Sequence, residues 1–226
     1  MNKKNQLKLW MMGLFLAIVA PTLQSCDDDD DDYGRYMPNA LVTLKTQEGD
    51  DAFYLQLDDK TTLWPSNIKQ HPYKGKEVRA LVNFTYEKQV NEGPQSVFVN
   101  WIDTIRTKPM AIDMGEENDN TYGTDPLELV KDWVTVVEDG YLTIRFRTLY
   151  TGNNVHVLNL VKGEKDYEVI LHHDAQGDTQ GYMSVGMIAF RLDKLPDTEG
   201  ETVDLTVKWN SFSGEKSTTF KYCTRK

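Results

Sequence analysis

The sequence lacks a disulfide framework, a surplus of basic residues and a membrane-spanning segment. Its 226 residues include 2 cysteines, too few for a disulfide scaffold, so stability has to come from ordinary hydrophobic cores. Lysine and arginine number 25 against 35 aspartate and glutamate residues, a formal net charge of -10. This excess of acidic residues argues against nucleic-acid binding, which requires a basic surface. No apolar run is long enough to cross a bilayer, and no repeat, coiled coil or long helical pattern is present.

Signatures of catalysis are missing as well. The sequence contains no Gly-x-Ser-x-Gly, no His-Glu-x-x-His and no glycine-rich phosphate loop. Glu116, Glu117 and Asp119 could supply paired carboxylates for glycoside hydrolysis, but a polar connecting segment could not hold such a pair in geometry. Cys223 follows a terminal strand pattern and is expected to be a buried structural thiol. We therefore expect no enzyme activity and no cofactor.

The N-terminus carries the most specific signal in the chain. Three lysines within the first eight residues precede an apolar run at 9–20, which is typical of a signal peptide. Leu23, Gln24 and Ser25 then precede Cys26, a pattern that resembles a bacterial lipobox. The resemblance implies acylation of the Cys26 thiol, with fatty acids such as palmitate, and cleavage before it. An ordinary signal peptide with a chance cysteine is the alternative, and the cysteine's place directly after the apolar run argues against it.

Six consecutive aspartates, Asp27 to Asp32, follow this cysteine. Like charges repel, so the run forms an extended, solvated spacer. Its first four members, Asp27, Asp28, Asp29 and Asp30, also resemble the export signal that sends lipoproteins to the outer face of the outer membrane. A calcium-binding tail is a third interpretation, although adjacent carboxylates without turn geometry make a poor cage. The sequence thus predicts a lipid-anchored protein of the outer membrane, exposed at the cell surface.

Alternating apolar and polar residues predict strands in the first half. The clearest case is Lys76 to Tyr86, with Ala80, Val82 and Phe84 on one face. The expected strands are 40–44, 53–57, 61–64, 76–86 and 96–106. Five short strands without a helical period predict a small closed barrel of the OB type.

A second set of strands follows a polar connector at 108–125. Glu138-Asp139-Gly140 is the strongest hairpin signal. The inner face of this hairpin is expected to hold Val134, Val136, Leu142, Ile144 and Phe146. The expected strands are 133–137, 141–150, 155–161, 167–172, 186–192, 202–209 and 217–222. Short strands with turn clusters between them predict an immunoglobulin-like β-sandwich. The expected parts are a signal peptide (1–25), a lipidated cysteine with an acidic tether (26–38), a barrel (39–112) and a sandwich (113–226).

Short stretches along the whole chain resemble the NigD-like lipoprotein family. They include Phe53 to Asp59, Trp101 to Ile105, His156 to Val161 and His172-His173-Asp174. The resemblance implies an N-terminal OB-type barrel and a C-terminal immunoglobulin-like sandwich, in agreement with the strand pattern. Members of the family are called bacteriocin immunity proteins on the basis of gene context, and the family offers no catalytic residues.

Two groups of residues are candidates for ligand binding. His172, His173, Asp174 and Asp178 are the only cluster with metal-ligand side chains, but adjacent histidines on a strand point to opposite faces, so we expect no metal site. Tyr54, Trp64 and Tyr73 fall where an OB barrel binds ligands on aromatic platforms. For Trp64 the alternative is a place in the barrel core or at the barrel's end.

The leading functional hypothesis is a surface-anchored lipoprotein that acts by binding, in a bacteriocin-immunity-like manner, to a protein partner. The membrane is the second partner, through the lipid anchor. The alternative is a glycan-binding accessory lipoprotein of a surface saccharide system, and an envelope hydrolase comes third.

Overall fold

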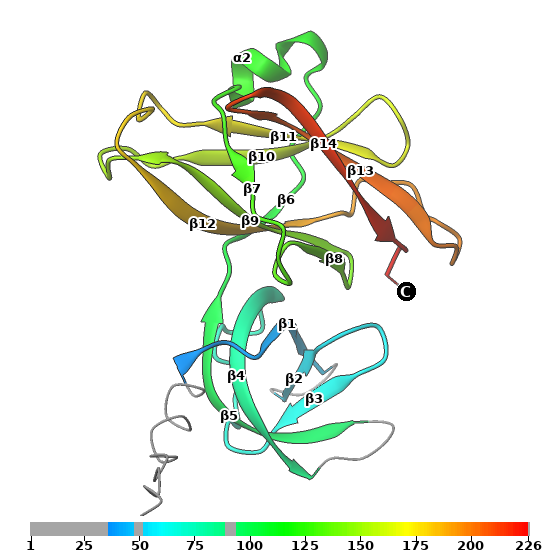
Figure 1. Ribbon diagram of the computed structural model, residues 1–226. Helices are drawn as coiled ribbons and strands as arrows, with labels where there is room; N and C mark the ends of the chain where they lie inside the picture. Colours follow the sequence, from blue (N-terminus) through cyan, green and yellow to red (C-terminus); the bar gives the residue numbers. More distant parts are fainter. Residues whose placement is uncertain (1–35, 48–51, 89–93, 226) are drawn as a thin grey trace, which may run out of the picture.

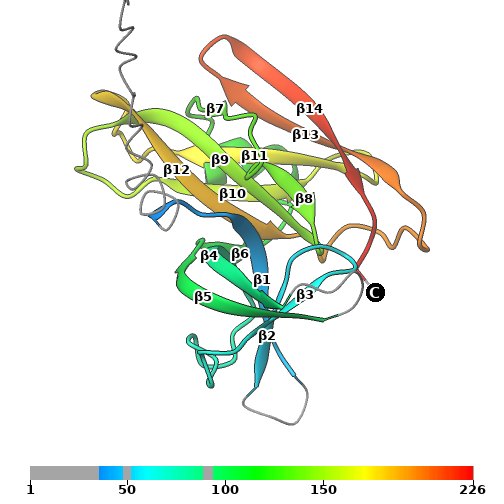
Figure 2. The same ribbon diagram turned by 60° about the horizontal axis from the view of Figure 1, so that its bottom comes forward.

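The computed structural model of the protein describes residues 36–47, 52–88 and 94–225. It consists of a closed barrel of five strands followed by two packed sheets (Figures 1 and 2). The predicted all-β fold, an OB-type barrel followed by a β-sandwich, is confirmed. Within the described ranges, neither short helix is long and apolar enough to cross a membrane.

The barrel strands pair in the order β1-β2-β3-β5-β4. They are β1 (Ala40–Thr46), β2 (Phe53–Gln56), β3 (Thr62–Pro65), β4 (Val78–Lys88) and β5 (Gln95–Thr104). Alternate residues point inward, and Ala80, Val82 and Phe84 of β4 belong to the barrel core as the alternation predicts. The pairing of β4 with β5 slips between Asn83 and Phe84. A bulge of this kind bends a strand and helps a small sheet close.

The sandwich has one sheet of four strands and one of five. The four-stranded sheet has the order β10-β11-β13-β14, and the five-stranded sheet has the order β6-β12-β9-β7 with β8 beside β9. The strands are β6 (Thr107–Pro109), β7 (Glu128–Leu129), β8 (Val136–Glu138), β9 (Tyr141–Tyr150), β10 (Val157–Lys162), β11 (Glu168–Asp174), β12 (Tyr182–Arg191), β13 (Val203–Ser211) and β14 (Gly214–Tyr222). Their inward side chains form one apolar core that includes Leu142, Ile144 and Phe146 of β9.

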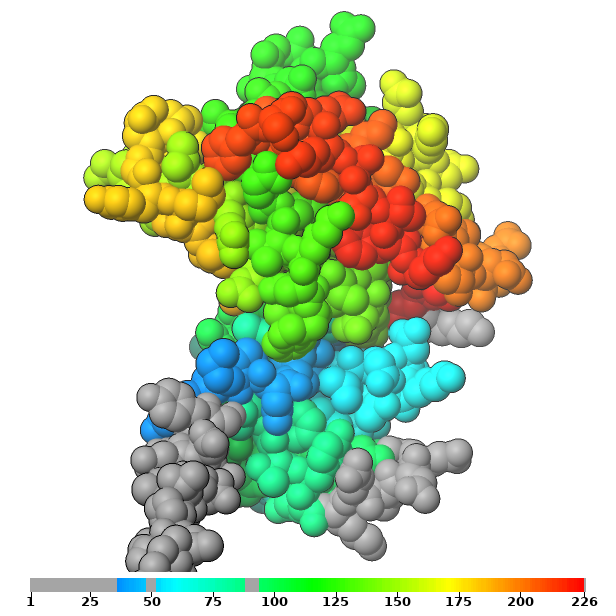
Figure 3. Space-filling view, in the orientation of Figure 1, coloured from blue at the N-terminus to red at the C-terminus, as the bar shows by residue number. Residues whose placement is uncertain are grey.

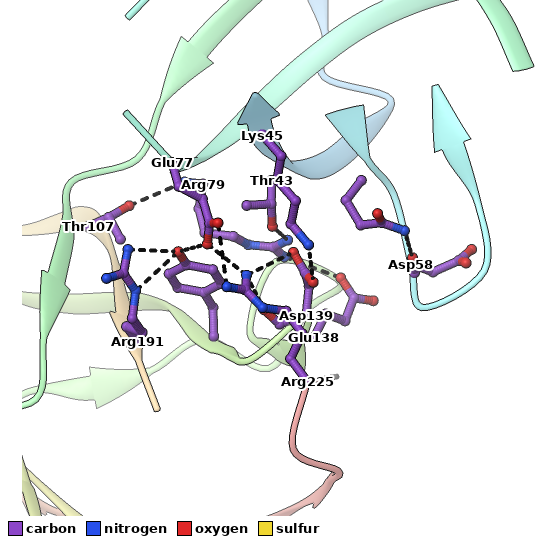
Figure 4. A network of polar contacts seen from close by, with 12 residues as sticks. Thr43, Lys45, Asp58, Glu77, Arg79, Thr107, Glu138, Asp139, Arg191 and Arg225 are labelled. Atoms are coloured by element: carbon purple, nitrogen blue, oxygen red, sulfur yellow. Dashed lines mark hydrogen bonds and ion pairs between the residues drawn. The ribbon is translucent and has the colours of Figure 1, made fainter. Parts of the chain in front are cut away.

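The predicted hairpin between β8 and β9 has a two-residue turn. Asp139 and Gly140 have φ angles of 49° and 76°. Positive φ at both central residues is the geometry of a type I′ turn, which Asp-Gly adopts at little cost. The turn projects from the sandwich toward the barrel, as Figure 4 shows, and therefore places Glu138 and Asp139 at the domain interface.

Two features differ from the sequence-based expectation. The connector predicted at 108–125 contains β6, which already pairs with β12 of the sandwich, and two short helices, η1 (Gly115–Glu117) and α2 (Asn118–Tyr122). By strand pairing, the chain leaves the barrel between β5 and β6. In addition, Val134 and Val136 do not join the sandwich core but pack in a separate cluster against the barrel. Period-2 alternation identifies a buried face but not which domain buries it.

Candidate functional site

The outer face of the five-stranded sheet, turned away from the sandwich core, is divided into two ends. Residues paired across antiparallel strands share a face, so Ala189 and Thr143 lie on this face, as do Val185 and Arg147 further along. The barrel packs on the first end, where Ala189 joins Leu41 of the barrel in an apolar cluster. We call the first end, with Tyr141, Thr143, Ala189 and Arg191, the covered end. We call the second end, with Met183, Val185, Met187 and Arg147, the open end.

A buried arginine of the barrel holds the covered end in place (Figure 4). Arg79 on β4 is fully buried, and its guanidinium donates to the Thr43 hydroxyl at 3.0 Å and to the Thr143 hydroxyl at 3.3 Å. Its third partner is the carboxylate of Glu138 at 3.2 Å. One arginine of β4 therefore joins β1 of the barrel to β8 and β9 of the sandwich, with one bond from each of its three nitrogens.

Further polar contacts surround this arginine. Lys45 of β1 pairs with Asp139 of the β8–β9 turn at 2.7 Å. Arg225, after the last strand, pairs with Glu77 before β4 at 2.6 Å. Tyr141 donates its hydroxyl hydrogen to the same Glu77 carboxylate. The two domains are thus connected by charge-assisted bonds at three places around an apolar cluster.

Burial and charge shift the ionisation of these groups in different directions. Burial lowers the pKa of Arg79, and the nearby Glu138 carboxylate opposes the shift. Burial raises the pKa of Glu138, although Arg79 acts the other way. Burial alone would raise the pKa of Glu77, but hydrogen bonds from Arg225 and Tyr141 outweigh it and lower the pKa. The covered end therefore contains carboxylates whose charge is coupled to domain packing.

The open end carries exposed apolar side chains on the same two strands. Met183, Val185 and Met187 are 51%, 50% and 37% exposed. Arg147, beside Val185, is exposed and forms no ion pair with any described residue. In Figure 1 the barrel lies below one end of β12 and the other end extends beyond it, and Figure 3 shows this gold segment standing clear of the barrel.

The backbone edge of β12 is also free along this end. One edge of β12 pairs with β9 over its full length, whereas β6 pairs with the other edge only at Ala189, Phe190 and Arg191. Among the described strands, none pairs with that edge from Tyr182 to Ile188. Edge strands are normally protected by charged residues or proline. The stretch Tyr182 to Ile188 contains neither.

A small apolar hollow lies behind the open end, on the inner side of the sheet. Its volume is about 210 Å³, and Phe146, Tyr150, Val155 and Gly186 are among its lining residues. Tyr182, at the start of β12, is 87% exposed. The sandwich is therefore incompletely closed between β12 and the residues before β10, and apolar surface is exposed on both sides of the β12 edge.

The predicted aromatic residues of the barrel lie in two places. Tyr54 and Trp64 are neighbours on the outside of β2 and β3, with ring centroids 5.5 Å apart and an interplanar angle of 30°. Both are partly exposed. Tyr73 instead packs against the barrel core, and its ring contacts His71. The three residues therefore do not form one platform, and their role in ligand binding stays a prediction.

The histidine cluster is buried and hydrogen-bonded. His172 and His173 are 5% and 2% exposed, and their Nδ1 atoms lie 3.2 Å from the carbonyl oxygens of Gly123 and Asp125, respectively. Nε2 of His173 lies 2.9 Å from Nδ1 of His156. Burial and the neighbouring His156 lower the pKa of His173. Asp178 accepts bonds from the amide and the hydroxyl of Thr151.

No group of three or more metal-ligating side chains with suitable geometry occurs in the part of the chain that the structure describes. Asp174 is partly exposed and accepts from the amide of Gln176. Glu116, Glu117 and Asp119 belong to η1 and α2, and all three are exposed. Cys223 is half-buried beside the hydroxyl of Thr198. The lipobox residues Leu23 to Ser25, the lipidation site Cys26 and the export signal at Asp27 to Asp30 lie outside the described residues.

Sequence reasoning overlooked both ends of the outer face. Arg79 stands in a strand pattern as an ordinary outward-facing charge, and nothing in the sequence marks it as buried by a second domain. The start of β12 was missed because its side chains are exposed on both faces. One usable signal was present: a strand-forming run, Tyr182 to Ile188, without any charge.

Two family models match consecutive parts of the chain. Residues 41–105 match the NigD-like N-terminal OB domain, and residues 110–222 match the NigD-like C-terminal beta sandwich domain. The chain belongs to the NigD-like family. The resemblance found in the sequence is thereby confirmed, and the two models divide the chain between β5 and the end of β6. No curated protein matched the chain.

Solved structures share the NigD-like architecture. A protein of Parabacteroides distasonis, described as toxin related, is 36% identical, with 81% of this chain and 92% of that chain covered and a TM-score of 0.70. A NigD-like immunity protein of Bacteroides caccae is 19% identical, with coverages of 81% and 96% and a TM-score of 0.60. A protein of Bacteroides fragilis described as a lipoprotein is 10% identical, with coverages of 83% and 98% and a TM-score of 0.53. The last two show the fold alone.

Proposed function

We propose that this NigD-like protein is a surface-anchored binding protein that docks a partner protein at the open end, and that it protects by binding, as an immunity protein does. The observation that carries the proposal is the division of one sheet face. The same two strands are covered by the barrel at one end and carry apolar side chains without cover at the other. The open end is continuous with the surface on which the barrel packs. Exposed apolar surface of this kind commonly marks a protein interaction site.

The partner is expected to add an extended strand to β12. The free edge from Tyr182 to Ile188 offers unpaired backbone groups in the direction that β6 occupies further along. Strand addition supplies affinity through main-chain hydrogen bonds and specificity through alternate side chains. Met183 and Val185 would contact apolar residues of the added strand, and Arg147 would pair with a carboxylate.

Anchoring supports this role. The lipobox at Leu23 to Ser25 and the Cys26 acylation site would hold the protein in the outer membrane, and the aspartate spacer would keep the barrel away from the lipid surface. Replacing Cys26 by alanine is expected to release the protein from the membrane fraction. Protection that survives this release would contradict the anchored part of the proposal.

Binding alone would suffice for protection, so the proposal assigns no reaction to the chain. An immunity protein can occlude a toxin or its receptor by surface complementarity. The names of two structural neighbours, one toxin related and one an immunity protein, support a role in such an encounter.

The test is site-specific photo-cross-linking on intact cells. A photoreactive residue is placed at Val185 in the open end or, as a matched control, at Thr219, an exposed position on β14 of the other sheet. The expected result is one dominant protein cross-linked through position 185 and not through position 219, identified by mass spectrometry. Met183→Glu should abolish that product, and Thr219→Glu should leave it intact.

Two results would overturn the proposal. One is equal cross-linking from both positions, because it would mean that the photoreactive residue captures whatever protein happens to be nearby. The other is a product that persists in Met183→Glu, since a charge at this position should disrupt apolar contact with an added strand. A product that consists of two copies of this chain would replace the heterologous partner by a dimer.

A second candidate, glycan binding, rests on the Tyr54–Trp64 pair outside the barrel. Partly exposed aromatic faces can stack on sugar rings. Titration with surface oligosaccharides should then quench tryptophan fluorescence, and Trp64→Phe should remove the quenching. Absence of quenching in the wild-type protein would eliminate this candidate.

A further inference from the structure

The hollow behind the open end lies where the two sheets of the sandwich separate. The five-stranded sheet lines it with inward-facing residues of β9 and β12, namely Phe146, Thr148, Tyr150, Ser184 and Gly186. Val155 and His156, which precede β10, line it from the side of the other sheet. None of the described residues in this lining is an aspartate, glutamate, lysine or arginine. The hollow therefore suits an apolar group better than an ion, because a charge buried there would lack a counter-charge.

The same edge of β12 shows how the sandwich is closed further along. There β6 pairs with β12, and Lys108 of β6 stands opposite Phe190, a residue of the sandwich core. The Lys108 side chain crosses to the other sheet. Its ammonium group donates to the carbonyl oxygen of Leu158 and, at 2.7 Å, to the side-chain oxygen of Asn159, both in β10. A strand on this edge thus sends an inward side chain across the gap between β12 and β10.

Beside Gly186, no described residue supplies such a side chain. The pairing of β6 with β12 begins only at Ala189, because the residues before β6 lead out of the barrel. The hollow takes the corresponding place, with Gly186 on one side and Val155, two residues before β10, on the other. An added strand that continues the line of β6 along this edge therefore directs every second side chain toward the hollow.

The size and the lining of the hollow favour an aromatic side chain. Its volume of about 210 Å³ is larger than the ~150 Å³ of an apolar cavity that admits benzene. The tip of the Phe146 ring packs over Gly186. The ring of Tyr150 stands edge-on to that of His156, with centroids 5.1 Å apart. Val155 and Tyr150 are 65% and 39% exposed, so a side chain in the hollow covers apolar surface. Aromatic rings also attract one another beyond the gain from buried area.

We propose that this hollow is an anchor pocket for the partner protein, filled by an aromatic side chain on the inward face of the strand that is added to β12. The anchor pocket rests on the docking at the open end proposed above and specifies the chemistry of the partner there. The added strand places its outward side chains beside Met183 and Val185, and one phenylalanine, tyrosine or tryptophan between Gly186 and Val155. A few buried aromatic residues often supply most of the binding energy of a protein interface.

The first test needs no partner. It uses the chain from residue 26 with Cys26→Ser, which contains every described residue and, without a lipid, needs no detergent. The probe is p-cresol, the side chain of tyrosine. The matched probes are 4-methylcyclohexanol, which is not aromatic, and 4-methylbenzoate, which is charged. p-Cresol should shift the amide resonances of Val155 and Gly186 saturably. 4-Methylcyclohexanol should bind about fivefold more weakly, because it makes no aromatic pair, and 4-methylbenzoate should not bind.

The second test fills the hollow from within the chain. Ser184, half-buried in the lining, is replaced by phenylalanine. The control, Thr219→Phe, adds the same ring at an exposed position of β14 in the other sheet. Ser184→Phe should abolish p-cresol binding and lower the cross-linking of the partner through Val185 at least about tenfold, whereas Thr219→Phe should change neither.

Three outcomes would reject the anchor pocket. The first is no saturable change at Val155 and Gly186 with p-cresol, and the second is a matched probe that binds as tightly as p-cresol. The third is a folded Ser184→Phe protein that captures the partner as well as the wild type does, in which case the docking at the open end stands without the anchor. Absence of a cross-linked product in the wild-type protein rejects the docking itself, and the anchor with it.

Discussion

The barrel buries one end of the outer face and leaves the other end exposed, although the two ends consist of similar residues. At the covered end, Ala189 is fully buried against the barrel and the guanidinium of Arg79 donates hydrogen bonds to groups from both domains. At the open end, six residues earlier on the same strand, Met183 is half exposed and the neighbouring Arg147 has no ionic partner among the described residues. Both ends combine apolar side chains with an arginine.

This difference shows what cover does to the same type of surface. A guanidinium that is solvated at the surface contributes little to stability, whereas a buried one becomes indispensable once its partners depend on it. The apolar residues behave in the same way: each Leu or Ile that the barrel buries contributes about 1.5–3 kcal/mol, and an exposed valine contributes almost nothing until a partner covers it. The open end therefore resembles an interface before assembly.

The largest difference in the free energy of unfolding is expected between two matched arginine substitutions. Arg79→Met should reduce the free energy of unfolding by about 3 kcal/mol, because it removes one member of a buried pair and leaves the hydroxyls of Thr43 and Thr143 without a donor. Arg147→Met should change it by less than about 0.5 kcal/mol. Urea unfolding measures both. Similar losses in the two variants would mean that the ends do not differ in cover.

A smaller loss of stability is expected from a substitution within the open end. A Cβ at Gly186 would lie 2.5 Å from the tip of the Phe146 ring, which packs over the glycine on the inner side of the sheet. Gly186→Ala should therefore cost about 1–3 kcal/mol through overpacking. Ser184→Ala, on the same face of β12, is the control and should cost much less. An unaffected Gly186→Ala would show that the strand is loosely packed here and not a firm base for a partner.

The sequence predicts the strands that a core buries and misses those that it does not. Alternation located β4 and β9 well, because their core residues recur at every second position: Ala80, Val82 and Phe84 in β4, and Leu142, Ile144 and Phe146 in β9. It began the last long strand of the five-stranded sheet at Gly186, whereas β12 starts at Tyr182. The missing residues are exposed on both faces, so no buried period marks them. The segment that we assign to partner binding is thus the one with the weakest pattern.

Domain contacts were hidden for a different reason. Val134 and Val136 have the alternation of core residues, and only the placement of the barrel decides that they pack outside the sandwich core. Arg79 is hidden likewise, because a charged residue on an outward strand position predicts solvent. The candidate ligand-binding residues Tyr54 and Trp64 do lie side by side, because β2 and β3 are neighbouring strands. Tyr73 lies in a loop, and its sequence position did not indicate where its side chain points.

Acid should remove the stability that Glu77 contributes at the covered end and leave the contribution of the open end unchanged. The folded-state pKa of Glu77 lies below its ordinary value, so the unfolded chain binds more protons in acid, and the stabilisation present above about pH 4.3 is lost as the pH falls further. Glu77→Gln should flatten this part of the stability–pH curve measured by urea unfolding. Arg147→Met should keep the wild-type slope. If Glu77→Gln retains the full slope, the Arg225 and Tyr141 contacts do not govern acid sensitivity.

The smallest effect on folding should come from the residue with the largest effect on binding. Val185→Lys places a charge on a side chain that is half exposed, so the free energy of unfolding should change by less than about 0.5 kcal/mol. The same lysine on the outer face would be desolvated by an added strand, and partner capture should fall at least about tenfold. Ala189→Lys, at the covered end of the same face, should instead unfold the protein, since Ala189 is fully buried. A Val185→Lys protein that is destabilised would mean that the chain's own fold already covers the open end, whereas a stable variant with normal capture would place the partner elsewhere.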